Sequence, residues 1–296
     1  MTSCLNCGRP LSSLSLGEVG NVCPECRAAA NVGAIRTATN PAPPTRVVVR
    51  ARGPVTTALV GTNVAVFVAM ALSGVSLSEP TTQQLLRWGA NWGPSSLGSE
   101  PWRILTSNYL HIGVLHILFN MWCLWDLGNL AERIFDRWTY VAAYTACGIA
   151  GSISSLWWHP MVVGAGASGA IFGLAGALIS ALYLGGLPIP KQAVQRTLKS
   201  LLLFAGYNLF FGAVGAGIDN SAHLGGLITG LAIGAVLARR LTYPPAERRA
   251  WNRAVFVVTA IVLLIAFNLV KQANHKFPEP PQALIGLSPA TASASR

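Results

Sequence analysis

Long apolar runs separated by basic loops constrain the fold of this chain more than any other feature. A helix of about 20 apolar residues crosses the hydrocarbon core of a bilayer, and 52% of the 296 residues are hydrophobic whereas only 10% are charged. We therefore predict an all-α polytopic membrane protein. Its seven predicted spans are Val55–Leu72, Ile112–Leu130, Trp138–Trp158, Ser168–Leu187, Leu198–Val214, Ala222–Ala238 and Ala254–Val270.

The net charge of +11 follows the membrane loops rather than forming a nucleic-acid surface. With a cytoplasmic N-terminus, all of the 21 Lys and Arg residues lie on the cytoplasmic side except Arg87, Arg103, Lys271, Lys276 and Arg296. Basic loops stay in the cytoplasm. We therefore expect an integral protein of a bacterial plasma membrane, with the N-terminus cytoplasmic and the C-terminus extracytoplasmic. The lipid bilayer is its predicted partner, and nucleic acid is not.

Composition divides the chain into five predicted parts. Residues 1–30 form a zinc-ribbon-like cytoplasmic segment, and residues 31–52 form a basic linker rich in Ala, Thr, Pro and Arg. Residues 53–241 hold a core of six transmembrane helices. Residues 242–271 add a basic loop and a seventh helix, and the Pro-, Ala- and Ser-containing residues 272–296 are predicted to be a disordered extracytoplasmic tail.

Two CxxC pairs, Cys4 with Cys7 and Cys23 with Cys26, stand in the first segment. Each pair can present two sulfurs to one tetrahedral ion, which is typical of a four-thiolate structural zinc site. Two redox dithiols or a disulfide pair are the alternatives. We favour zinc because the cytoplasm keeps thiols reduced and because so short a segment needs a staple to fold.

Polar side chains inside predicted spans mark the candidate site, since they are costly at membrane depth. His116 lies near the start of the second span, while Ser168 opens the fourth and His223 opens the sixth. With the orientation above, all three lie one to two turns below the outer surface. Three groups that are useful in catalysis therefore share one depth.

Ser168 stands where a Gly- and Ala-rich loop turns into a helix, a position whose free backbone N–H groups suit an oxyanion. His223 can supply the base that a serine hydroxyl needs. Small residues spaced by four on the fourth and sixth spans, such as Gly169 and Gly226, let two helices approach closely. The alternative is that this serine and these glycines serve helix packing alone.

His116 and Asn120 are four residues apart and share one helix face. That face can offer two hydrogen-bond donors to a developing oxyanion. A hydrogen bond to a neighbouring span is the alternative for both side chains. For His111, on a different face, we expect a structural role in the loop.

Taken in order, these residues resemble the rhomboid family of intramembrane serine proteases over roughly residues 55–240. The motifs that carry the resemblance are Trp102-Arg103, His111, the run from His116 to Asn120, Glu132-Arg133, the run from Gly166 to Gly169, and the run from Ala222 to Gly226 that continues to Gly230. The zinc-ribbon-like segment and the seventh span are additions to the minimal six-helix pattern.

The resemblance implies a serine endopeptidase that cleaves transmembrane-segment substrates near the outer side of the membrane. Ser168 would be the nucleophile and His223 the general base, a dyad with no third carboxylate. The side chains of His116 and Asn120 and the backbone N–H of Ser168 would form the oxyanion hole, beside Gly166.

Further residues would support this site. The resemblance places the Phe172 ring on the catalytic histidine, makes Phe119 and the fifth span the border of a lateral substrate gate, and makes Trp102 and Arg103 the anchor of the first loop. It implies no cofactor for catalysis, so zinc would have only a structural role in the N-terminal segment.

Two other functions are compatible with parts of the sequence. A catalytically inactive rhomboid-like protein would bind membrane clients, but such relatives typically lack the serine or the histidine. A transporter or channel would place charged residues along a path through the bilayer, whereas Asp126 is the only clear acid within a span.

Overall fold

The computed structural model describes residues 3–4, 6–9, 23, 25–26, 28, 53–215 and 217–274. They belong to two units, Met1–Ala51 and Arg52–Arg296. The predicted linker, most of the predicted N-terminal segment and the predicted tail beyond residue 274 lie outside the described residues.

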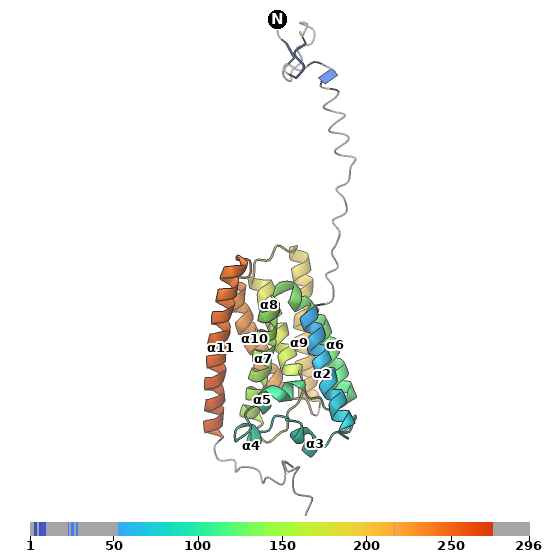
Figure 1. Ribbon diagram of the computed structural model, residues 1–296, viewed down its shortest axis with the longest axis vertical. Coiled ribbons are helices and arrows are strands. Elements are labelled where there is room, and N and C mark those ends of the chain that lie inside the picture. Colours follow the sequence, from blue (N-terminus) through green and yellow to red (C-terminus); the bar gives the residue numbers. More distant parts are fainter. Residues whose placement is uncertain are drawn as a thin grey trace, which may run out of the picture. The chain divides into compact units, whose positions relative to one another are not determined.

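Helices build the described part of the larger unit, which contains no strand and only one isolated bridge, between Asn91 and Gly164 (Figure 1). This confirms the predicted all-α class. The long helices are α2 (Pro54–Leu72), α6 (Val114–Ile134), α7 (Arg137–Trp158), α8 (Ser168–Leu184), α9 (Lys191–Val214), α10 (Asn220–Ala238) and α11 (Pro245–Ala273). Between α2 and α6 lie α3 (Thr82–Arg87), α4 (Gly93–Ser96), α5 (Arg103–Thr106) and the 3-10 helix η2 (Ser107–Tyr109).

Local sequence sets several of the helix starts. Pro54 is in the first turn of α2, where its missing N–H costs no hydrogen bond. Asp136 accepts from two backbone N–H groups at the start of α7, and Asp219 does the same at the start of α10. The apolar run predicts a start at Leu198 for the next span, but α9 begins at Lys191. Its first turns therefore belong to the basic loop that precedes the apolar run.

By length and composition, α2, α9, α10 and α11 can each cross a membrane, and α6 passes together with the segment Arg103–Tyr109, from which it is bent by 91°. The remaining two predicted spans are α8, which is apolar but has only 17 residues, and α7, which is rich in small and hydroxyl-bearing residues. Both are extensively buried within the protein, so they need less apolar length than a helix that faces lipid.

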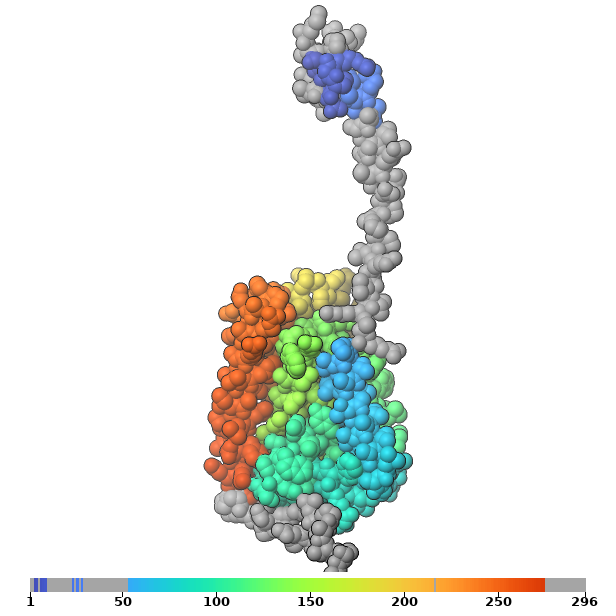
Figure 2. All heavy atoms as spheres, in the orientation of Figure 1, coloured from blue at the N-terminus to red at the C-terminus, as the bar shows by residue number. Residues whose placement is uncertain are grey.

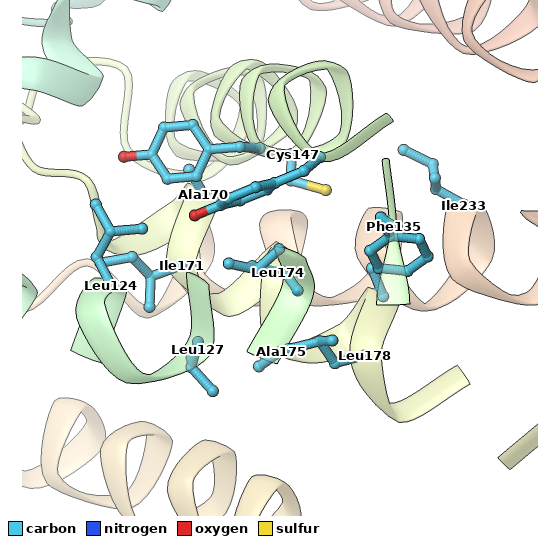
Figure 3. Close-up of a cluster of buried hydrophobic side chains, with 14 of the residues drawn as sticks. Leu124, Leu127, Phe135, Cys147, Ala170, Ile171, Leu174, Ala175, Leu178 and Ile233 are labelled. Carbon is cyan, nitrogen blue, oxygen red and sulfur yellow. The ribbon is translucent and has the colours of Figure 1, made fainter. Parts of the chain in front are cut away.

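The α8 helix lies in the middle of the bundle (Figure 1). Side chains from several helices converge on it, including Leu124 of α6, Cys147 of α7 and Ile233 of α10 (Figure 3). Leu174 of α8 is fully buried among them. The N-terminal end of this central helix carries Ser168, so the packing of the core also fixes the position of that hydroxyl.

The closest helix contact in the site region joins α8 and α10 through small residues. A Cβ on Gly226 would overlap the Gly169 carbonyl oxygen, and a Cβ on Gly230 would overlap that of Gly173. Two backbones this close gain van der Waals contact that larger residues would prevent. A hydrogen bond also joins the two helices, since Ser180 Oγ of α8 donates to the Leu231 carbonyl of α10 over 2.8 Å.

The α11 helix runs along one edge of the larger unit, where Figure 2 shows it in orange. Asn252 Nδ2 donates to Thr139 Oγ1 of α7 over 2.8 Å, and Trp251 Nε1 donates to the Val236 carbonyl of α10 over 3.0 Å. Near the other end of the helix, Val270 is buried against the loop helices and α7. The seventh helix is therefore attached to the core at both of its ends.

We predict that Gly230→Ala lowers the free energy of unfolding by about 1–3 kcal/mol, because the added methyl group must separate α8 from α10. Unfolding in detergent, followed by circular dichroism, measures the change. The matched control is Gly61→Ala in α2, where a Cβ meets no atom within 4 Å and should leave stability unchanged or slightly higher. Equal stability of the two variants would show that close α8–α10 packing is not required.

Candidate active site

Ser168 and His223 are hydrogen-bonding partners although 55 residues separate them. The Ser168 Oγ atom lies 2.9 Å from His223 Nε2. Ser168 is the first residue of α8 and His223 lies in the first turns of α10, so the α8–α10 contact brings these two helix starts together. The serine is half-buried and the histidine is buried.

The His223 ring is held on its face and at its second nitrogen. The Phe172 ring stacks on it, with ring centroids 4.3 Å apart and planes inclined by 11°. Its Nδ1 atom lies 3.3 Å from Asn220 Oδ1. Asp219 caps the same turn by accepting from the backbone N–H groups of Ser221 and Ala222. The imidazole is therefore constrained at both nitrogens and on one face.

The loop before Ser168 is held by the segment between α2 and α6. Asn91 and Gly164 exchange backbone hydrogen bonds of 2.9 and 2.8 Å, and the Gly166 N–H donates to the Ser107 carbonyl over 2.9 Å. Gly166 has φ +144°, a conformation that favours glycine. The backbone leading to the serine is thus set by two contacts with the first loop and by one glycine.

His116 presents its Nε2 atom to the loop that leads to Ser168. The Ile112 N–H donates to His116 Nδ1 over 3.2 Å, and a neutral imidazole that accepts at Nδ1 carries its hydrogen on Nε2. A Cβ added to Gly166 would lie 3.0 Å from His116 Nε2 and 3.7 Å from Ser168 Oγ. The donor nitrogen and the serine hydroxyl therefore both border the Gly166 position.

Asn120 is buried one turn further along α6. Its side-chain amide donates to the backbone carbonyl of His116 over 2.9 Å. This is a contact within one helix, and no contact of Asn120 with Ser168 or His223 is found among the described residues. Its role as an oxyanion donor stays a prediction.

Trp102 and Arg103 fix the first loop. The Arg103 side chain is 2% exposed, and its Nε donates to Glu100 Oε2 over 2.8 Å while its Nη1 donates to the carbonyls of Leu86 and Ala90. The Arg103 guanidinium also lies 4.8 Å from the centre of the Trp102 ring. A buried arginine with three acceptors holds α3, α5 and the residues between them in fixed positions relative to one another.

The predicted gate residues lie at the surface. Phe119 is exposed on α6, beside Trp122 at a ring-centroid distance of 6.5 Å. On α9, the Phe204 ring packs against the Phe172 ring with centroids 5.4 Å apart, which joins this helix to the ring that covers His223.

His111 is fully buried, and its ring is in edge contact with the His116 ring at a centroid distance of 5.2 Å.

Four cysteines gather in the smaller unit, and all of them are free thiols. The sulfurs of Cys4, Cys7, Cys23 and Cys26 lie within 4.8 Å of one another. The Cys23 N–H donates to Cys4 Sγ over 3.2 Å, and this hydrogen bond is the main reason why the pKa of Cys4 is lowered to about 6. Gly8 follows the first pair with φ +73° and donates to the Cys4 carbonyl.

Sequence reasoning missed several residues of the site. Ser107 anchors the serine loop, Asp219 caps the histidine turn, and Asn220 contacts His223. Asp219 and Asn220 lie four and three residues before His223, so helix periodicity was a signal for them. Ser107 had no such signal, because its partner is distant in sequence.

Comparisons with known proteins indicate the family of this chain. Residues 98–240 match the Rhomboid domain. The chain belongs to the rhomboid family. The rhomboid protease GluP of Bacillus subtilis (strain 168) is 37% identical over 186 residues, which are 63% of this chain and 35% of GluP. The rhomboid protease AarA of Providencia stuartii is 29% identical over 247 residues, which are 75% of this chain and 84% of AarA.

Plant proteins match this rhomboid as well. RHOMBOID-like protein 4 of Arabidopsis thaliana is 38% identical over 146 residues, which are 49% of this chain and 36% of that protein. This chain therefore spans only about a third of the length of that protein and of GluP. Family membership and the apolar helices make the chain an integral membrane protein.

We predict that Arg103→Ala lowers the free energy of unfolding by about 3–5 kcal/mol, since it leaves Glu100 and two carbonyl oxygens without their buried partner. Thermal unfolding in detergent micelles measures the loss. The exposed Arg87 at the end of α3 provides the control, and Arg87→Ala should change stability by less than about 0.5 kcal/mol. An Arg103→Ala protein as stable as this control would contradict the anchoring role.

Proposed function

We propose that this rhomboid is an intramembrane serine endopeptidase that cleaves transmembrane-segment substrates near the outer side of the membrane. The observation that carries the proposal is the 2.9 Å contact between Ser168 Oγ and His223 Nε2. A serine hydroxyl becomes an effective nucleophile when a positioned imidazole takes its proton. The N-terminal end of α8 adds a positive dipole at the serine.

The reaction proceeds in two steps on the chain's own groups. In the first, His223 Nε2 takes the proton of Ser168, Oγ attacks the scissile carbonyl carbon, and the imidazolium returns the proton to the leaving amine as the peptide C–N bond breaks. In the second, His223 takes a proton from water, the hydroxide oxygen attacks the acyl-enzyme, and the proton returns to Ser168 Oγ as the product acid leaves. Neither step uses a cofactor.

The oxyanion formed in each step receives hydrogen bonds from the backbone N–H of Ser168 and from the side chains of His116 and Asn120. Support comes from the position of His116 Nε2, which borders Gly166 as the serine hydroxyl does. A first-turn N–H has no partner within its own helix, so that of Ser168 suits this role. Donors held in place before the reaction stabilise the transition state without reorganisation.

A single-span substrate reaches the site laterally, between α6 and α9. The exposed aromatic side chains Phe119 on α6 and Phe210 on α9 suit contact with lipid and with a substrate helix. From the distribution of basic loops we further propose that the N-terminus lies in the cytoplasm. The similarity to GluP of Bacillus subtilis and AarA of Providencia stuartii supports a bacterial plasma membrane. Cleavage then takes place near the extracytoplasmic face.

We expect Ser168→Ala to abolish cleavage of a model single-span substrate in liposomes and leave the fold intact, because it removes one hydroxyl and no helix contact. His223→Ala should have the same effect. Gel analysis of cleavage, with circular dichroism as the folding control, measures both. Turnover retained in either variant refutes the dyad. Substrate binding without turnover in the unmodified protein would instead favour a client-binding rhomboid-like protein.

His116→Ala and Asn120→Ala should each slow turnover by about 10- to 10³-fold without abolishing it, since a lost oxyanion donor costs a few kcal/mol of transition-state stabilisation. Steady-state kcat on the same substrate gives the size of each effect. A full rate in both variants would return the two side chains to a purely structural role.

We also propose that Cys4, Cys7, Cys23 and Cys26 hold one structural zinc ion. Their Sγ atoms fit it, because Zn–S bonds of about 2.3 Å give sulfur separations of about 3.8 Å in a tetrahedron, and Cys7 and Cys23 are 3.7 Å apart. A disulfide would need about 2.05 Å. When bound, zinc would supply folding energy to this short segment and take no part in proteolysis.

Metal analysis of protein purified under reducing conditions should therefore find one zinc ion per chain. The double variant Cys4→Ser/Cys7→Ser should bind none and still cleave the model substrate in detergent at close to the original rate. An unmodified protein without zinc would refute the metal site. Loss of turnover in a double variant with a folded helical core would refute the separation of zinc from catalysis.

A further inference from the structure

Asn220 joins His223 to a third helix. It is the first residue of α10 and lies three residues before the histidine, so both side chains lie on the same helix face. Asn220 Oδ1 lies 3.3 Å from His223 Nδ1. On its other side, Asn220 Nδ2 donates to the Leu209 carbonyl of α9 over 2.9 Å.

The Leu209 contact decides which way the amide points. A backbone carbonyl only accepts, so the nitrogen of the Asn220 amide must face it, and the oxygen must then face His223. An amide oxygen accepts but cannot donate. The His223 nitrogen opposite it, Nδ1, therefore carries the hydrogen, and Nε2 is left as the acceptor for Ser168.

The α9 helix also shapes the space around this amide. Gly212 is buried one turn after Leu209, and a Cβ there would overlap Asn220 Oδ1 and lie 2.8 Å from its Cγ. The amide thus fits between a carbonyl and a glycine of α9. The α9 helix holds the amide in the one orientation that presents its oxygen to the histidine.

We propose that Asn220 is a positioning residue that fixes the tautomer and orientation of His223 for its contact with Ser168. This inference rests on the proposed protease function and deepens it. In Ser-His-Asp and Cys-His-Asn proteases a third group orients the histidine in the same way. Here that group is a neutral amide, and its own orientation is set by Leu209 and Gly212.

Nitrogen-15 NMR of histidine-labelled full-length protein in micelles tests the positioning role of Asn220 without requiring activity. The chain has 5 histidines, and the signals absent from His223→Gln identify those of His223. We expect an Nδ1–H, Nε2-acceptor tautomer in the unmodified protein and a mixture of tautomers in Asn220→Ala. Gly212→Ala should produce the same change while keeping every hydrogen-bonding group. An Nε2–H tautomer in the unmodified protein overturns the proposal whether or not the variants fold.

Kinetics on the model substrate provide the second readout. Asn220→Ala should lower kcat about 3- to 10-fold at unchanged KM, the effect of one hydrogen bond made to the reacting base. The control is Asn268→Ala in α11. The Asn268 amide donates within its own helix, to the Leu264 carbonyl over 2.8 Å, so this variant should retain the original kcat. Unchanged kcat and unchanged His223 signals in Asn220→Ala overturn the positioning role even if Ser168 proves essential. If the unmodified protein does not cleave but shows the predicted tautomers, the protease function fails and the positioning stands.

Discussion

Close packing of α8 against α10 is the contact on which the rest of the site depends. Within a bilayer, the hydrophobic effect does not drive helices together, so their association relies on van der Waals contact and on hydrogen bonds between them. Gly226 and Gly230 allow the α10 backbone to meet the carbonyls of α8 directly. With these glycines in place, two helix starts that are far apart in sequence bring Ser168 and His223 within 2.9 Å.

The other elements of the core keep this pair in register. Phe172 on α8 and the α9 helix constrain the His223 ring, while the first loop, anchored by Arg103, holds the backbone before Ser168. The α8 helix can be short and nearly surrounded by protein because α6, α7 and α10 cover it. The result is a polar site at the end of a central helix whose core is closely packed and apolar.

Much of this arrangement can be predicted from the sequence, and there are physical reasons why the rest cannot. Apolar runs predict the long helices because lipid allows few alternatives to a helix, but they miss the basic first turns of α9, where charge replaces hydrophobicity. Polar residues at membrane depth single out His116, Ser168 and His223, whose catalytic roles stay predictions. The contacts of Ser107 with the serine loop and of Asn220 with Leu209 of α9 join segments that meet only in three dimensions, so no spacing rule predicts them.

Labelling of the purified protein with a fluorophosphonate, mapped by mass spectrometry, reports whether the packing of α8 against α10 has produced a reactive serine. We expect one modified residue, Ser168, with labelling lost in His223→Ala and slowed in Gly230→Ala but not in Gly61→Ala. Modification of another residue, or labelling of Ser168 that continues at the original rate without His223, would contradict it.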